Sequence, residues 1–450
     1  MERQLISCVD KNQKTYIELL RRAVQIPSLT GEEGIAQEFI ADNLQDLGFS
    51  VESVEPDVEE IFKKFPEVAQ YPTHWQHDLI LPYETLPSWE ALVASGHQDV
   101  LNYKNRPNVF GTLPGKGTGK SLLINGHIDT VTVEPRSEWN YDPFGAYVDG
   151  DRLYGRGSAD MKGGIIAALC AVQTLVKCGA ELNGDLKFSS VVNEEHSGNG
   201  TLSLICQGIQ ADAAIVCEPT GNDVFTATPG DVYWEVCLDG NPRSPGARWK
   251  DWNLEGVSAI ENLPPIIEGF LALEKAYNQK AADPLYSNNN AFSCVMGEIS
   301  GGSYATVTAG QCSVKGCVYF GHGLGSVNEV MQNIKHYIQE ATNEHPWFKK
   351  NPPRVTFLHH RNSSKCNPQH AIIPTVLDSV RHVSGQLPKV FGSPYGSDMD
   401  MLINQARIPT VLLGPGSIAQ AHKANEYVSI QEYLTCIKAL ALSIYHWCNQ

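Results

Sequence analysis

The chain has 450 residues, of which 42% are hydrophobic and 19% are charged, so its composition indicates neither general disorder nor a fibrous fold. Its formal net charge of −16 offers no positive surface for a polyanion and argues against nucleic-acid binding. The length exceeds one ordinary core and predicts two domains, or one large domain that carries an inserted module.

From the sequence we expect neither a secretory signal at the start of the chain nor a membrane-spanning segment. Its first ten residues lack the basic and apolar stretches of a secretory signal, and no apolar run approaches the roughly 20 residues that span a bilayer. The twelve cysteines include no C-x-x-C pair, a pattern that suits reduced thiols better than a disulfide framework. We therefore expect a cytoplasmic protein without a membrane partner.

Helical patterns dominate the first fifty residues. Residues 13–24 have helical periodicity, which Ile26-Pro27 interrupts. The run from Thr30 to Glu33 predicts a capping box in front of an amphipathic helix over residues 35–47. Residues 57–96 have no clear period, so we expect a surface excursion or a lid-like segment there.

The middle of the chain alternates short apolar runs with longer helical ones, which predicts parallel strands covered by helices. Similar units return near the C-terminus. The sequence therefore predicts a mixed, mainly parallel α/β sheet flanked by helices. Strands are expected over residues 121–125, 186–192, 213–217 and 408–413, and helices over residues 165–176 and 430–447.

A stretch with a different sequence pattern lies between these units. Residues 232–238, 314–319 and 355–359 resemble half-buried strands, and residues 258–277 resemble an amphipathic helix. We assign residues 228–362 to an inserted α+β domain. The two parts of the main domain are then residues 1–227 and 363–450.

Potential metal ligands follow four of the expected strands. In open α/β sheets, ligands bind outside the carboxyl ends of the strands, so these side chains should converge. A single histidine near a strand end is more often structural, and adjacent glutamates are usually solvated. Their joint placement favours a hydrolytic metal site instead. The residues are His127, Glu194, Glu195, Glu218 and His422, and Asp160 joins them from a glycine-rich loop over residues 155–164.

These motifs, in this order, resemble the zinc aminoacylase and carboxypeptidase superfamily. Its members include acetylornithine deacetylase, succinyl-diaminopimelate desuccinylase and glutamate carboxypeptidase. The resemblance covers most of the chain and implies a homodimer, in which the inserted domain is a ferredoxin-like lid and dimerisation domain. It rests on Gly126-His127-Ile128-Asp129, the 155–164 loop, Asn193-Glu194-Glu195, Glu218-Pro219-Thr220 and Ala421-His422.

The resemblance implies two zinc ions, with cobalt or manganese as possible substitutes, bridged by Asp160. His127 and Glu218 would complete the protein ligands of one ion. Glu195 and His422 would complete those of the other.

Two further carboxylates would act beside the ions. Asp129 would accept the free imidazole N–H of His127 and so fix its tautomer. Glu194 would act as general base toward water and then as general acid toward the leaving amine.

The sequence departs from the family in the inserted domain. Ser244 stands where active relatives have a histidine that stabilises the oxyanion, and losing such a donor costs roughly 100- to 1000-fold in turnover. Arg243 beside it is a candidate replacement, although a surface arginine is the ordinary interpretation. Thr306 stands near an expected asparagine that often contacts substrate. Other candidate replacements are His322, His359 and His360.

The favoured function is removal of an acyl group from the nitrogen of a small amino-acid-like substrate, as in acetylornithine deacetylase. Deformylation or decarbamoylation of an acylated pyrimidine or amine is a nearby alternative, and a dipeptidase is a third. The alternative of another class is a divergent homologue with a non-hydrolytic biosynthetic or metal-dependent binding role, because Ser244 replaces the usual histidine.

Overall fold

The computed structural model describes residues 1–65, 88–96, 102–280, 283–286 and 291–450. These residues form two compact units. The first contains the described residues up to Thr228 together with Ser364–Gln450, and the second contains Pro229–Ser363. Each unit has its own buried apolar cluster. Part of the excursion expected over residues 57–96 lies outside the described residues.

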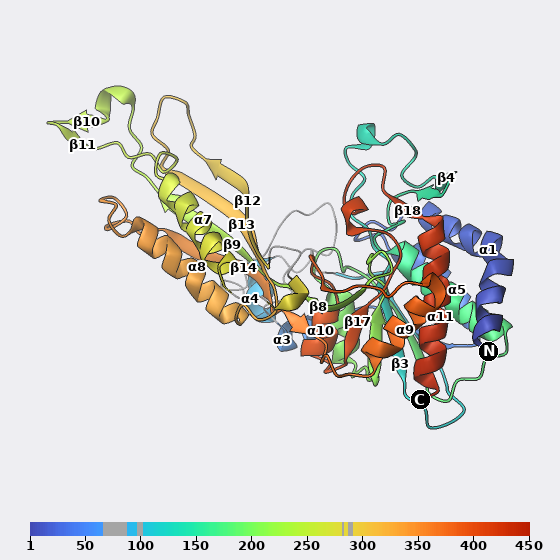
Figure 1. Ribbon diagram of the computed structural model, residues 1–450. Coiled ribbons are helices and arrows are strands. Elements are labelled where there is room, and N and C mark those ends of the chain that lie inside the picture. The colour runs from blue at the N-terminus through green and yellow to red at the C-terminus, as the bar shows by residue number, and fades with distance from the viewer. Residues whose placement is uncertain (66–87, 97–101, 281–282, 287–290) are drawn as a thin grey trace. The chain divides into compact units, whose positions relative to one another are not determined.

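The first unit is built on a sheet with nine described strands (Figure 1). Eight follow the order β1-β2-β6-β3-β7-β17-β8-β15, and β16 pairs with β8. The central strands β6, β3, β7 and β17 are parallel, which confirms the predicted mixed α/β fold with a mainly parallel centre. The strands are β1 (Ser50–Val54), β2 (Asn108–Leu113), β3 (Leu122–His127), β6 (Leu186–Val191), β7 (Ala213–Val216), β8 (Val224–Thr228), β15 (Ser364–Lys365), β16 (Val390–Gly392) and β17 (Thr410–Leu412).

A smaller antiparallel sheet lies in the same unit, in the order β18-β5-β4. Its strands are β4 (Tyr147–Asp149), β5 (Arg152–Tyr154) and β18 (Tyr427–Ser429).

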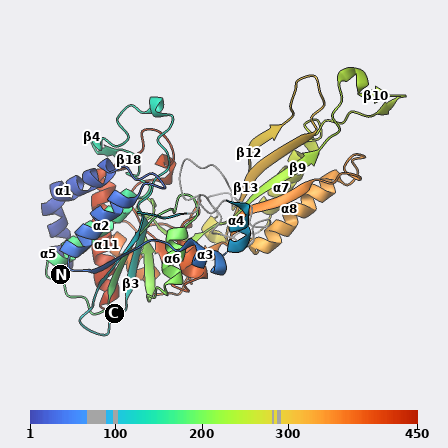
Figure 2. The same cartoon turned by 180° about the vertical axis from the view of Figure 1, so that it is seen from behind.

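Helices cover both faces of the large sheet. Figure 1 shows α9 and α11 on the near side, and Figure 2 shows α6 on the opposite side. α5 is buried on nearly every turn because its sequence is apolar all round, and it packs against α1 and α11. The helices are α1 (Glu2–Gln25), α2 (Gly34–Asp46), α3 (Val58–Lys64), α4 (Trp89–Ser95), α5 (Lys162–Lys177), α6 (Asn199–Cys206), α9 (Ile372–Ser384), α10 (Met399–Asn404) and α11 (Ile430–Cys448).

The second unit is a four-stranded antiparallel sheet, in the order β12-β13-β9-β14, packed against two helices. Its chain order, β9-α7-β12-β13-α8-β14, is the ferredoxin-like arrangement. Trp234 of β9 stacks on Phe270 of α7 with ring centroids 3.8 Å apart, which anchors helix to sheet. The elements are β9 (Gly230–Asp239), β10 (Trp249–Lys250), β11 (Asn253–Leu254), α7 (Pro264–Asn278), β12 (Phe292–Gly301), β13 (Gln311–Phe320), α8 (Val327–Thr342) and β14 (Arg354–Arg361).

Two local predictions were wrong. The capping box at Thr30 does not form, because Glu33 is the N-cap of α2 without a side-chain cap, and the Thr30 hydroxyl donates to Asp129 at 2.8 Å. The helix expected from residue 258 begins only at Pro264. None of the described helices has the length and apolar character needed to cross a membrane.

Candidate metal centre

The proposed ligands follow the carboxyl ends of neighbouring strands in the first unit. His127 is the last residue of β3, while Glu194 and Glu195 come shortly after the end of β6. Glu218 follows β7 by two residues, and His422 lies in the loop that continues from β17. β6, β3, β7 and β17 are consecutive in the sheet, so their parallel direction brings these loops to one edge.

Three carboxylates surround His127. Its Nε2 atom lies 3.3 Å from Asp160 Oδ1, 3.9 Å from Glu194 Oε2 and 4.0 Å from Glu218 Oε1. The imidazole is fully buried, and the Glu194 side chain keeps only 12% of its surface exposed. Because Glu194 lies as close as Glu218, distance alone does not separate a ligand from a base on this side of the site.

His422 forms the other side of the cluster. Its Nε2 atom lies 2.9 Å from Glu195 Oε2 and 3.5 Å from Asp160 Oδ2. Asp160 therefore presents one carboxylate oxygen to His127 and the other to His422. A carboxylate placed in this way has the geometry to be shared by two cations.

Asp129 holds the glutamate pair rather than the histidine alone. Its carboxylate accepts hydrogen bonds from the Thr30 hydroxyl at 2.8 Å and from the backbone N–H groups of Glu194 and Glu195 at 3.1 and 3.2 Å. The sequence predicts that this carboxylate accepts the His127 N–H. In the structure His127 Nδ1 lies 2.9 Å from the Asp129 backbone carbonyl and 3.5 Å from the carboxylate, so the carbonyl is the nearer acceptor.

The electrostatics of the cluster fit a cation. Burial raises the pKa of Glu218 well above its usual value, and the neighbouring Asp160 raises it further. Burial on its own lowers the pKa of His127, but the neighbouring Asp129 and Asp160 carboxylates hold it well above its usual value. The Glu195 carboxylate raises the pKa of His422 to about 9. Without a metal the cluster therefore holds extra protons, which cation binding would release.

The donor set also fits the chemistry of hydrolytic metals, because imidazole nitrogens and carboxylate oxygens are the ligands that zinc uses in catalytic sites. Possible ligand sets within the described residues are His127, Asp160 and Glu195, and His127, Glu194 and Glu218.

Two buried charged residues beside the cluster were not singled out from the sequence. Arg156 and Glu426 form an ion pair of 2.7 Å, with exposed side-chain fractions of 4% and 0%. Arg156 stands in the glycine-rich loop and Glu426 follows His422 by four residues, but sequence spacing gives no sign that the two meet.

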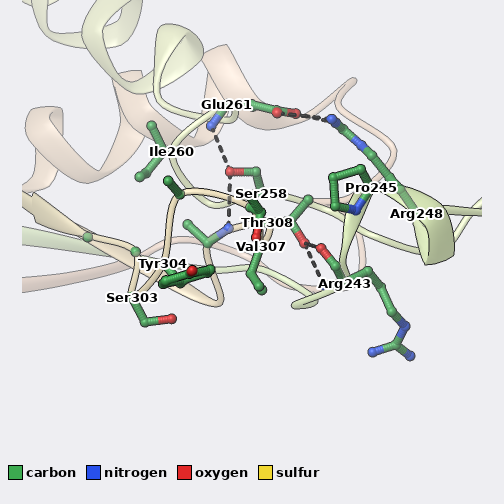
Figure 3. A pocket seen from close by; sticks show the side chains of 15 residues that line it. Arg243, Pro245, Arg248, Ser258, Ile260, Glu261, Ser303, Tyr304, Val307 and Thr308 are labelled. Atoms are coloured by element: carbon green, nitrogen blue, oxygen red, sulfur yellow. Dashed lines mark hydrogen bonds and ion pairs between the residues drawn. The ribbon is translucent and has the colours of Figure 1, made fainter.

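The three residues proposed for substrate binding, Arg243, Ser244 and Thr306, lie in the second unit and are exposed. Arg243 and Thr306 line a pocket of about 580 Å³ in that unit, shown in Figure 3. The Arg243 guanidinium donates to the Asn241 side chain at 3.2 Å and to the Pro242 carbonyl at 2.8 Å, so local acceptors already engage it.

Among the other histidines considered for this role, His359 is buried at 3% exposure. Its Nε2 atom lies 3.4 Å from Asp231, inside the second unit. That placement argues against a substrate contact.

The fold and the cluster define a class of enzyme: hydrolases whose metal ions are held by histidines and carboxylates at the carboxyl edge of a parallel sheet. Residues 123–446 match the model of Peptidase family M20/M25/M40, and the chain belongs to this family. The predicted resemblance to the zinc aminoacylase superfamily is confirmed. The chain is therefore a hydrolase of amide bonds.

Curated relatives include enzymes that act on different N-acyl groups. The N-formyl-4-amino-5-aminomethyl-2-methylpyrimidine deformylase of Halalkalibacterium halodurans is 32% identical over 377 residues, which cover 77% of this chain and 84% of the relative. The acetylornithine deacetylase of Edwardsiella ictaluri is 27% identical over 358 residues, which cover 78% and 86%.

Solved structures share the fold at low identity. The di-peptidase Dug1p of Saccharomyces cerevisiae has a TM-score of 0.73 at 14% identity and covers 100% of this chain and 98% of its own. A dinuclear metal-binding peptidase of the M20 family from Bacillus subtilis has a TM-score of 0.62 at 13% identity, with coverage of 97% and 99%.

Proposed function

We propose that this chain is a two-zinc N-deacylase that removes a small acyl group from the nitrogen of a small amine or amino acid. The observation that carries the proposal is the position of Asp160, whose two carboxylate oxygens face His127 and His422 separately. Glu194 Oε2 lies 3.9 Å from His127 Nε2, and we assign it as the base for hydrolysis.

Zinc ions at this cluster would polarise the amide carbonyl and make a water molecule acidic enough to react near neutral pH. Glu194 would accept the proton of the attacking water and later deliver it to the leaving amine. Asp129 holds the Glu194 backbone in place, because its carboxylate accepts the Glu194 N–H at 3.1 Å.

The substrate proposed from the sequence is an N-acylated amino acid, and the acetylornithine deacetylases among the relatives support it. A second candidate is an N-formylated heteroaromatic amine. It is favoured by two pyrimidine deformylases at 32% and 30% identity, compared with 27% to 29% for four acetylornithine deacetylases.

We also propose that the protein is a homodimer joined through the second unit. β12 is an edge strand of the four-stranded sheet in the described part of the chain, and it exposes Val295 and Ile299 at 57% and 58%. Exposed β-branched residues on an edge strand favour pairing with another strand. The twelve unpaired cysteines support a reducing, cytoplasmic location.

The test is a substrate panel assayed with the metal-free protein and after addition of two equivalents of zinc or cobalt. The panel contains N-acetylornithine, N-formyl-4-amino-5-aminomethyl-2-methylpyrimidine and a dipeptide. We expect metal-dependent release of acetate or formate from one of the first two substrates. Absence of turnover while both metals are bound would instead support the divergent, non-hydrolytic role that Ser244 raises.

A further inference from the structure

Glu426 is a fully buried carboxylate that contacts the loop carrying Asp160. Its Oε1 atom accepts the backbone N–H of Ala159 at 2.8 Å and that of Asp160 at 3.1 Å. Its backbone carbonyl accepts the N–H of Gly155 at 2.9 Å. Glu426 therefore fixes the peptide from which the shared Asp160 carboxylate projects.

Arg156 joins the same carboxylate to two further segments of the site. Its Nη1 atom donates to Glu426 Oε2 at 2.7 Å and to the backbone carbonyl of Lys423 at 3.3 Å. Its Nη2 atom donates to the backbone carbonyl of Thr132 at 3.0 Å. Lys423 is the neighbour of His422, and Thr132 follows Asp129 by three residues.

The turn that carries His422 needs such support. The His422 side chain is 57% exposed, and the His422 backbone adopts a left-handed conformation with φ of 58°, which is unfavourable for a residue with a side chain. Contacts that hold this turn include those from Arg156, from Glu426 and from Asn425, whose side chain donates to the Glu138 carbonyl at 3.0 Å.

From these contacts we infer that Arg156 and Glu426 are positioning residues that set the geometry of the Asp160 and His422 side of the metal centre. The inference rests on the proposed two-metal function. The ion pair joins three segments that are distant in sequence, so its loss should loosen the ion held by Glu195 and His422. The ion held by His127 and Glu218 should be affected less, because it shares only Asp160 with the other ion and β3 and the β7 loop carry its remaining ligands.

The test variant is Glu426→Gln. Glutamine keeps the size of the side chain and one acceptor for the Ala159 and Asp160 N–H groups, but its amide N–H₂ would face the Arg156 guanidinium, donor against donor. Partners that orient metal ligands change metal affinity by roughly 10- to 100-fold. We expect one of the two cobalt affinities to fall by that factor, measured by visible absorption during a Co²⁺ titration and by calorimetry with Zn²⁺.

A kinetic measurement separates positioning from general destabilisation. With Glu426→Gln, raising the cobalt concentration about 100-fold should restore most of the kcat that is lost at low cobalt, with KM unchanged. The control is Arg361→Met, which removes a partly buried ion pair of 3.0 Å with Asp231 in the second unit. This control should lower the melting temperature and leave both cobalt affinities as in the wild type.

Arg156→Lys provides the second variant, because lysine keeps the charge beside Glu426 but loses the fork that reaches Thr132 and Lys423. If Glu426→Gln does not fold, the cobalt affinities of Arg156→Lys test the inference in its place. Two cobalt sites of wild-type affinity in these variants would overturn the inference and leave the proposed function intact. A wild-type protein that binds fewer than two ions would overturn both.

Discussion

The Asp160 carboxylate contacts both histidines of the cluster, and the Asp160 backbone N–H donates to Glu426. Asp129 does the same for the glutamate pair through its two backbone hydrogen bonds. At the scale of single residues, Asp160, Glu194 and Glu195 are thus each held through the backbone by a buried carboxylate that is not a proposed metal ligand. The Glu426 and Asp129 carboxylates thus act on the site by accepting backbone N–H groups of the residues that carry the proposed chemistry.

Glu194→Gln separates the role of base from that of ligand. The amide cannot accept the proton of water, and general acid and base catalysis contributes roughly 100- to 10,000-fold, so kcat should fall by that factor. Metal content, measured by elemental analysis, should stay at the wild-type value.

The matched variant is Glu195→Gln. The Glu195 carboxylate lies 2.9 Å from His422 Nε2, so this variant should lose metal as well as activity. Loss of metal from Glu194→Gln to the same extent would make Glu194 a ligand, contrary to the proposal.

At the scale of elements, α2 is tied to the loop in front of β2 by a buried ion pair. Arg106 Nη1 lies 3.0 Å from Glu33 at the N-cap of α2, with exposed side-chain fractions of 5% and 0%. Arg106 also stacks over the Tyr103 ring at 4.6 Å, and the Tyr103 hydroxyl accepts the Asn193 side-chain amide at 2.8 Å. This chain of contacts leads to the residue before Glu194.

We expect Arg106→Met to lower the free energy of unfolding by about 3–5 kcal/mol, because it leaves the Glu33 carboxylate buried without a partner. The double variant Glu33→Leu with Arg106→Met should lose much less, since it removes both charges. Urea denaturation of the single and double variants measures the difference. Equal losses in both would mean that packing, rather than charge, makes this contact important.

The sequence predicts elements well where one short segment contains the whole signal. Strands β3, β6 and β7 and helices α5 and α11 follow from apolar runs or periodicity. β1 and β2 were not predicted. β1 is largely exposed and lacks a continuous apolar run, so its sequence does not mark it as a strand. The capping box failed because Thr30 bonds to Asp129, 99 residues away. The contact between Arg156 and Glu426 spans 270 residues, and no local pattern encodes it.

At the scale of the whole molecule, the exposed edge of β12 bears on assembly. If it pairs with a second copy, Ile299→Lys should place an unpaired charge in the interface and shift the protein from dimer to monomer, as measured by sedimentation. Ile35→Lys is the control, because Ile35 is 68% exposed on α2 in the first unit and should leave the dimer intact. A monomeric wild-type protein would contradict the proposed homodimer.

The position of β17 has a consequence for biosynthesis. This strand lies between β7 and β8 in the sheet, although nearly two hundred residues separate it from them in the chain. Until the ribosome has added residues 410–422, β7 and β8 lack the strand between them and His422 has not been made. A nascent chain that already carries His127, Asp160 and Glu218 therefore cannot assemble a complete centre before His422 has been added.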